Sequence, residues 1–180
     1  MRDQGLRARA THVALPALAG GFALALLFTA DAGAGTVTVT DLAEPGLAAH
    51  VDLLGAQYAN DLDGFSARVS VRDVQPRTAT LGFTLTFPKA GEVFRVTAVR
   101  AKSGAQTTSV ARERGHRDKR TCSAFVATWY DTGDRVDVHV PWSCLGELRT
   151  GMKVQAHLAR GSGPQATPAD SVQAAKVPYN

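Results

Sequence analysis

Residues 65–72 read Phe-Ser-Ala-Arg-Val-Ser-Val-Arg, and this stretch is the clearest indication of the fold class. Its odd-numbered positions hold Phe, Ala, Val and Val, whereas its even-numbered positions hold Ser, Arg, Ser and Arg. Successive side chains of a β-strand point to opposite faces of a sheet, so this pattern buries one face and exposes the other. The stretch therefore predicts a half-buried strand of an antiparallel sheet.

The same period of two recurs along the chain, in residues 81–87, 94–98, 136–140 and 154–158. Residues typical of tight turns lie between these stretches, namely Asp61-Leu-Asp-Gly64, the Pro76 segment, Pro88-Lys-Ala-Gly91 and Asp131-Thr-Gly-Asp134. No stretch after the first 34 residues shows a sustained helical stripe. Short strands separated by such turns predict a sandwich or a barrel. We expect a single antiparallel, jelly-roll-like β-sandwich, because two inner faces can build one core.

The chain has 180 residues, which suits one folded domain. We expect the β-sandwich domain to span residues 50–180. Residues 35–49 are mostly small and polar, which predicts a flexible lead-in that contains one candidate strand, Thr36–Thr40. Near the other end, residues 161–168 look loop-like, and residues 172–177 could supply a last short strand.

Residues 1–34 have the pattern of a secretory signal peptide that is removed on export. Three arginines occur in the first nine residues, an apolar run follows over residues 13–28, and Ala30–Ala32 and Ala32–Ala34 resemble signal-peptidase sites. The alternative is an uncleaved membrane anchor, but a run of about 16 residues is short of the ~20 that span a bilayer. We therefore expect a secreted protein with no transmembrane span after cleavage.

The chain has two cysteines, Cys122 and Cys144, and both follow the leader. In an oxidising compartment an even count predicts a disulfide. A zinc site would need four ligands at close, paired spacing, and a nucleophilic cysteine would need a partner histidine. The sequence contains no Cys-x-x-Cys pair and places no histidine beside either cysteine. The disulfide is the favoured interpretation.

The formal net charge is +4, but three of the arginines lie in the leader, so the remaining chain is only slightly positive. This balance does not favour nucleic acid as a partner. One basic run stands out, and it contains Arg112, Arg114, Arg117, Lys119 and Arg120. It is either an exposed hairpin loop, a docking surface for an anionic polymer or membrane headgroups, or a protease-sensitive segment. Aromatic side chains are absent from the run, which again argues against nucleic acid.

Three aromatic residues, Trp129, Tyr130 and Trp142, could form a sugar-stacking platform. In a β-sandwich, however, a large aromatic side chain is more often part of the core. Trp142 lies two residues before Cys144, so it could simply cover the disulfide. The three residues are candidate ligand-binding residues, with the core as the alternative.

The sequence lacks familiar catalytic and cofactor signatures. There is no Gly-x-Ser-x-Gly elbow, no His-Glu-x-x-His and no phosphate-binding glycine motif. Asp131, Asp134 and Asp137 could suggest calcium, but Asp134 and Asp137 should face opposite sides of a strand. We therefore predict no cofactor and no enzyme activity, although paired carboxylates that meet only in space would leave no local signature.

One stretch carries a family resemblance. Residues 134–146, Asp-Arg-Val-Asp-Val-His-Val-Pro-Trp-Ser-Cys-Leu-Gly, resemble a segment of uncharacterised small secreted proteins from GC-rich bacteria, as do residues 65–73 and the upstream Cys122. Those proteins are similar, more distantly, to family-9 carbohydrate-binding and DOMON-like sandwiches. The likeness covers residues 50–180 and implies a non-catalytic sandwich. It carries over no binding residues.

These patterns favour a secreted, non-catalytic module that binds an extracellular ligand, such as a glycan or a cell-envelope polymer. The alternative is a protein-interaction or inhibitor module that uses exposed loops such as residues 109–120. A hydrolase whose site is assembled only in three dimensions is the least favoured class. The expected partners are thus an extracellular polysaccharide or a protein, and not nucleic acid.

The leader pattern makes a direct prediction. The exported protein should begin at Gly33 or Gly35, because cleavage is expected after Ala32 or Ala34. N-terminal sequencing of the protein recovered from the growth medium of an expressing bacterium measures this. A start at Met1 would contradict it.

Overall fold

A computed structural model of the protein describes residues 35–113, 119–120, 122–162 and 166–180, and the expected leader lies outside them. The strands are β1 (Thr36–Thr40), β2 (Leu53–Asn60), β3 (Gly64–Val71), β4 (Ala79–Phe87), β5 (Glu92–Arg100), β6 (Gln106–Arg112), β7 (Lys119–Arg120), β8 (Val126–Tyr130), β9 (Arg135–Pro141), β10 (Met152–Arg160), β11 (Thr167–Ser171) and β12 (Ala175–Val177). Two 3₁₀ helices, η1 (Ala49–Val51) and η2 (Trp142–Leu145), join them. Neither these nor any other described segment forms a helix long and apolar enough to cross a membrane.

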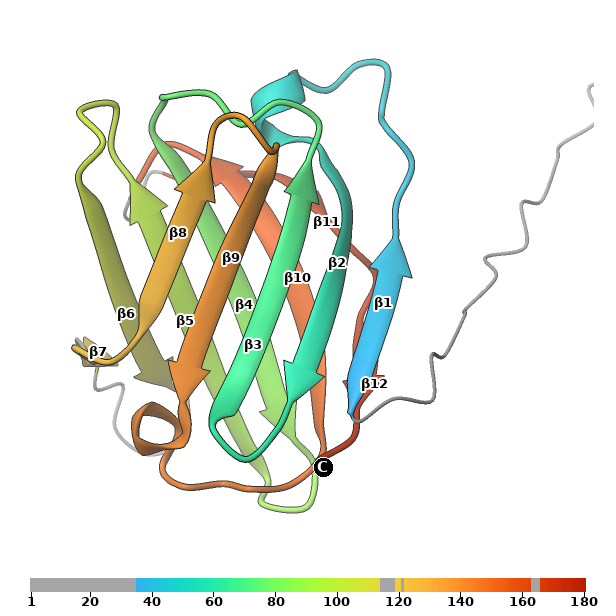
Figure 1. Ribbon diagram of the computed structural model, residues 1–180, viewed down its shortest axis with the longest axis vertical. Helices are drawn as coiled ribbons and strands as arrows, with labels where there is room; N and C mark the ends of the chain where they lie inside the picture. Colours follow the sequence, from blue (N-terminus) through green and yellow to red (C-terminus); the bar gives the residue numbers. More distant parts are fainter. Residues whose placement is uncertain (1–34, 114–118, 121, 163–165) are drawn as a thin grey trace, which may run out of the picture.

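The strands form two antiparallel sheets that pack face to face (Figure 1). Sheet A has the order β1-β2-β3-β9-β8. Sheet B has the order β11-β10-β4-β5-β6-β7, with β12 also paired to β10. The five stretches with a period of two lie within β3, β4, β5, β9 and β10, apart from Arg72, which directly follows β3. The predicted single antiparallel sandwich is therefore confirmed.

The strand order places distant parts of the chain side by side. β3 is followed by β4 in the other sheet, β9 is followed by β10 in the same way, and the pairs β3–β9 and β4–β10 are both antiparallel. In the strand letters of immunoglobulin domains, β2, β3, β9 and β8 of sheet A correspond to A, B, E and D. In sheet B, β11, β10 and β4 correspond to G, F and C. This is the strand order of immunoglobulin-type sandwiches, with β5 and β6 in the places of C′ and C″ of the variable type.

This order stands in place of the expected jelly-roll-like order. Alternation shows which segments form strands, but it does not show which strands pair. The pairing decides between the two Greek-key arrangements, and it joins residues that are far apart in the sequence.

The core lies between the sheets and is built from the alternating apolar positions. At its centre the rings of Tyr58, Phe65 and Phe83 contact one another, with centroids 5.6–6.5 Å apart. These three side chains come from both sheets and are fully buried. Burial of such large rings is the main stabilising contribution available to a sandwich of this size.

The segment before residue 50 is part of the sandwich. β1 pairs with β2 along its whole length, from Thr36 opposite Ala59 to Thr40 opposite Gly55, and Val39 is buried. The candidate strand Thr36–Thr40 is thus an edge strand, and the sheet begins earlier than the expected boundary at residue 50.

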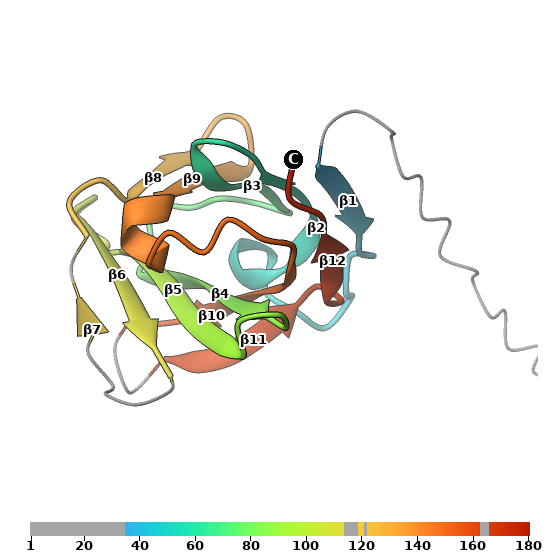
Figure 2. The same cartoon turned by 90° about the horizontal axis from the view of Figure 1, so that it is seen from below.

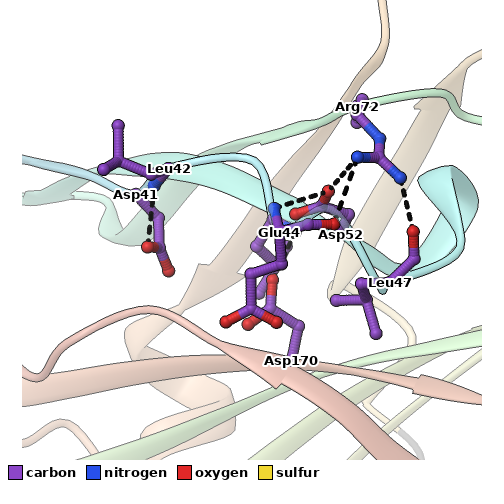
Figure 3. Close-up of polar contacts among 8 residues, drawn as sticks. Asp41, Leu42, Glu44, Leu47, Asp52, Arg72 and Asp170 are labelled. Carbon is purple, nitrogen blue, oxygen red and sulfur yellow. Dashed lines mark hydrogen bonds and ion pairs between the residues drawn. The ribbon is translucent and has the colours of Figure 1, made fainter. Parts of the chain in front are cut away.

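Polar contacts fix the connection from β1 to β2 (Figure 3). Asp52 is fully buried, and its Oδ2 pairs with Nη1 of Arg72 at 3.0 Å and accepts a hydrogen bond from the Glu44 N–H at 3.2 Å. Arg72 also donates from Nη2 to the Leu47 carbonyl at 2.5 Å. Across the sandwich, Asp170 accepts a hydrogen bond from the Leu53 N–H at 2.6 Å. The connection is therefore held by charged groups next to β2 and β3, and the start of β2 is bound by Asp170 on the distant strand β11.

The two sheets are also joined at the β1 edge. Viewed from below, β12 lies beside β1 and β2 (Figure 2). The buried Asn60 donates from Nδ2 to the Thr150 carbonyl at 3.1 Å, and its own carbonyl accepts a hydrogen bond from the Asn180 N–H at 3.2 Å. These bonds connect the end of β2 to the C-terminal segment.

Cys122 and Cys144 form the predicted disulfide, with Cα atoms 5.8 Å apart. Cys122 lies where the chain passes from β7 in sheet B to β8 in sheet A, and Cys144 lies in η2 directly after β9. The bond therefore links the crossover between the sheets to the segment after β9, at the end of the β8–β9 hairpin that is opposite its turn.

The burial pattern of β3 predicts different effects for two neighbouring substitutions. Val69 is fully buried, so Val69→Asp should prevent folding or lower the free energy of unfolding by at least about 3 kcal/mol, because it buries an unpaired carboxylate. Ser70 is exposed on the opposite face, and Ser70→Asp should change stability by less than about 0.5 kcal/mol. Thermal unfolding followed by circular dichroism measures both, and equal midpoints would refute the strand assignment.

The disulfide makes a second stability prediction. Cys144→Ser should lower the free energy of unfolding by about 2–5 kcal/mol, the usual cost of losing a native disulfide from a small exported domain. Urea denaturation of the parent and the variant under oxidising conditions measures the difference. Ser143→Ala, at the neighbouring exposed position, is the control and should match the parent. If Cys144→Ser also unfolds like the parent, the bond adds no stability.

Candidate functional site

The register of sheet A arranges its outward side chains in three rows that cross all the strands. The first row contains Thr36, Ala59, Ser66, His139 and Val126. The second row contains Thr38, Gln57, Arg68, Asp137 and Thr128. The third row contains Thr40, Gly55, Ser70, Arg135 and Tyr130. Because the alternate residues of β3 and β9 are buried, these rows form the outer surface of the sheet.

A groove of about 430 Å³ lies on this surface, lined mainly by the first two rows. It reaches from Thr36 on β1 to Val126 and Thr128 on β8, and so it crosses every strand of sheet A. Ala59 and Ser66 have short side chains, whereas Gln57 and Arg68 in the next row are long. The difference in side-chain size explains the hollow.

Two cross-strand contacts between β3 and β9 order the polar groups of the groove. The Ser66 hydroxyl and Nδ1 of His139 are 3.0 Å apart and share a hydrogen bond. Arg68 donates from Nε to Oδ1 of Asp137 at 3.0 Å and from Nη2 to Oδ2 at 3.4 Å. This hydrogen bond raises the pKa of Arg68 above its ordinary value. Each side chain is thus oriented before any ligand arrives.

Arg135 extends this charged arrangement beyond the groove. Its Nε lies 3.5 Å from Oδ2 of Asp137, and its guanidinium carbon lies 4.2 Å from the ring centroid of Tyr130. A cation over an aromatic face is attracted by the ring. Arg135 is thereby held next to the Arg68–Asp137 pair.

The groove presents hydrogen-bonding groups, and the one carboxylate among its described lining residues, that of Asp137, is engaged by two arginines. A serine nucleophile needs a base that a third group orients. The carboxylate two residues from His139 is that of Asp137, but it is engaged by Arg68 and Arg135. Among the described residues, no group of three or more His, Cys, Asp or Glu side chains is arranged to hold a metal ion. What the groove offers is hydroxyl, amide, guanidinium and carboxylate groups beside one exposed apolar residue, Val126.

The structure separates the three aromatic residues that could have formed a stacking platform. Trp142 is only 2% exposed, donates from Nε1 to the Asp61 carbonyl at 2.8 Å, and contacts Phe87 and Tyr179. Trp129 is half-buried and packs against the core, opposite the buried Val136. Tyr130 is the one that faces outward on sheet A. Trp142 and Tyr130 lie at opposite ends of the β8–β9 hairpin, so the three side chains form no common platform.

The basic run is only partly described, and the part that is seen is not a free loop. Arg112 ends β6 and forms an ion pair with Glu92 on β5, donating from Nε to Oε2 at 2.6 Å. Arg114 and Arg117 lie outside the described residues. The backbones of Lys119 and Arg120 form β7, which pairs with β6. At Arg112, Lys119 and Arg120 the expected loop is therefore replaced by strand.

The three aspartates that could have suggested calcium have separate partners. Asp131 accepts hydrogen bonds from Nη1 and Nη2 of Arg100 at 2.5 and 2.9 Å, and the hydrogen bond lowers the pKa of Asp131. Asp134 accepts a hydrogen bond from the Val74 N–H at 3.0 Å. Asp137 belongs to the groove. The three carboxylates thus serve different contacts.

Sequence reasoning did not assign the groove residues to a site. The alternation within residues 65–72 and 136–140 predicts that their polar side chains are exposed, and this is the correct side of each strand. The missing information was the pairing of β3 with β9, which places Ser66 opposite His139 and Arg68 opposite Asp137.

A scan against models of protein families found no match to the chain, and a search of curated proteins found no significant match.

Proposed function

We propose that this protein is an exported, non-catalytic binding module that holds an extended polysaccharide in the groove of sheet A. The groove that crosses all the strands of sheet A is the observation that carries the proposal. Its lining presents hydroxyl, amide, guanidinium and carboxylate groups on neighbouring strands. A chain of sugar residues presents hydroxyl groups at regular intervals, and such groups suit a lining of this kind.

The orientation of the groove supports a polymer as the ligand. Neighbouring strands lie about 4.8 Å apart, so a surface that crosses the strands of sheet A offers polar groups along roughly 20 Å. A small compact ligand would use only part of this length. An extended chain could contact Thr36, Gln57, Ser66 and Thr128 in turn.

Hydrogen bonds take the place of stacking in this proposal. Trp142 is buried and Trp129 packs on the core, so neither offers a ring to a sugar. Tyr130 is outside the groove lining, and Arg135 covers one side of its ring. We therefore assign recognition to the polar rows and not to an aromatic platform.

Export supports an extracellular or cell-envelope ligand. The leader pattern of residues 1–34 predicts secretion, and a disulfide is typical of oxidising compartments. Both features favour a polysaccharide of the cell envelope or of the surroundings over an intracellular ligand.

A matched pair of substitutions tests the proposal. Gln57 and Gln155 are both exposed in mid-strand, Gln57 in the groove of sheet A and Gln155 on the outer face of sheet B. Gln57→Ala should weaken polysaccharide binding about two- to tenfold, the range expected for one hydrogen bond. Gln155→Ala should bind like the parent.

Affinity electrophoresis in gels that contain neutral or acidic polysaccharides measures this binding. The parent should be retarded by at least one polysaccharide of the panel, and Gln57→Ala should be retarded less. If no polysaccharide retards the parent, or if both variants lose binding equally, the groove is not a polysaccharide site.

A further inference from the structure

The second row of sheet A and its neighbour Arg135 contain an excess of positive charge. Arg68 and Arg135 carry two guanidinium groups, whereas Asp137 between them carries one carboxylate. All three side chains reach solvent, with exposed fractions of 57% for Arg68, 39% for Arg135 and 28% for Asp137. The ionisable residues among the groove lining are Arg68, Asp137 and His139. The side of the groove formed by the second row is therefore cationic.

Arg68 has hydrogen-bonding capacity beyond its pair with Asp137. It contacts Asp137 side-on through Nε and Nη2. A guanidinium has five N–H groups, so a side-on pair leaves the edge formed by Nη1 and the second Nη2 hydrogen for another acceptor. That edge matches the two oxygens of a carboxylate, which can be bound in a bidentate way.

Arg135 also has hydrogen-bonding capacity that Asp137 does not use. Its Nε is buried without a hydrogen bond, because the nearest oxygen of Asp137 is 3.5 Å away. The contact with the Tyr130 ring fixes the position of the guanidinium but accepts no hydrogen bond in the plane of its N–H groups. A second carboxylate near Asp137 would balance the charge of the two arginines.

We infer that the polysaccharide of the groove carries carboxylates, and that one uronate carboxylate binds end-on to Arg68 beside Arg135. The inference rests on the proposed function, because it names the class of polysaccharide that the same groove would hold. Asp137 then has two opposing effects. It orients Arg68, but its negative charge repels the ligand.

Polysaccharides that differ only in their carboxyl groups test this inference. Suitable probes are polygalacturonate, alginate and hyaluronate, each compared with its own methyl-esterified, uncharged form. The parent should bind at least one acidic probe about tenfold more tightly than the ester, because a charge-assisted bidentate contact is lost in the ester. Binding of the acidic probe should weaken as salt rises from 0.02 to 0.5 M, since exposed charges are screened.

Variants locate the effect. Arg68→Gln should remove most of the preference for the acid over the ester, whereas Asp137→Asn should increase that preference about threefold by removing the repulsion. Arg95 and Glu113 form a similar exposed ion pair on sheet B, so Arg95→Gln and Glu113→Gln are the matched controls and should leave the preference unchanged. Unchanged melting temperatures show that the variants are folded.

The possible failures are distinct. If the esters or neutral polysaccharides bind as tightly as the acids, the groove holds a polysaccharide but the carboxylate inference is wrong. If polyglutamate binds as tightly as the acidic polysaccharides and competes with them, the site binds an acidic polypeptide equally well, which also overturns the inference. If no polysaccharide binds the parent at all, the proposed function itself fails.

Discussion

The pairing of β3 with β9 holds sheet A together and sets the register of its inner and outer faces. It joins Gly64–Ser70 to Arg135–Pro141 in one register, and it connects the two parts of the chain that build sheet A. A shift of one residue would turn the buried valines outward and the polar residues into the core. The same register sets Arg68 opposite Asp137 and Ser66 opposite His139. The core and the groove are therefore two faces of a single pairing.

Much of the fold could be predicted because the alternation of apolar and polar residues shows which face of each strand is buried and which is exposed. β3, β4, β5, β9 and β10 alternate cleanly, and the turn at Asp61–Gly64 lies where the sequence indicated. The alternation did not predict β2, because the register of β2 shifts between Leu53 and Gly55 and this shift breaks the period of two. The immunoglobulin-type strand order could not be predicted either, because alternation within a strand contains no information about which other strand it pairs with.

The candidate site was harder to predict than the fold because of the kind of residues that form it. Tryptophans are the obvious candidates for a sugar-binding site in a sequence, yet here Trp142 is buried against Phe87 and Tyr179, and Trp129 packs on the core. Gln57, Ser66 and Arg68 look like ordinary solvent-facing residues of a half-buried strand. They become a site only when short and long side chains are set next to each other across strands, and that depends on register.

The strand order of sheet A also determines when the sheet can be completed during synthesis of the chain. β1, β2 and β3 leave the ribosome early, but β8 and β9 follow only after most of sheet B has been made. Such distant pairings form late in folding, because a long loop must close before they contribute. A chain that has been made only as far as β7 therefore lacks the β8 and β9 side of the groove. The groove lining is therefore complete only after β9 has been made and has paired with β3.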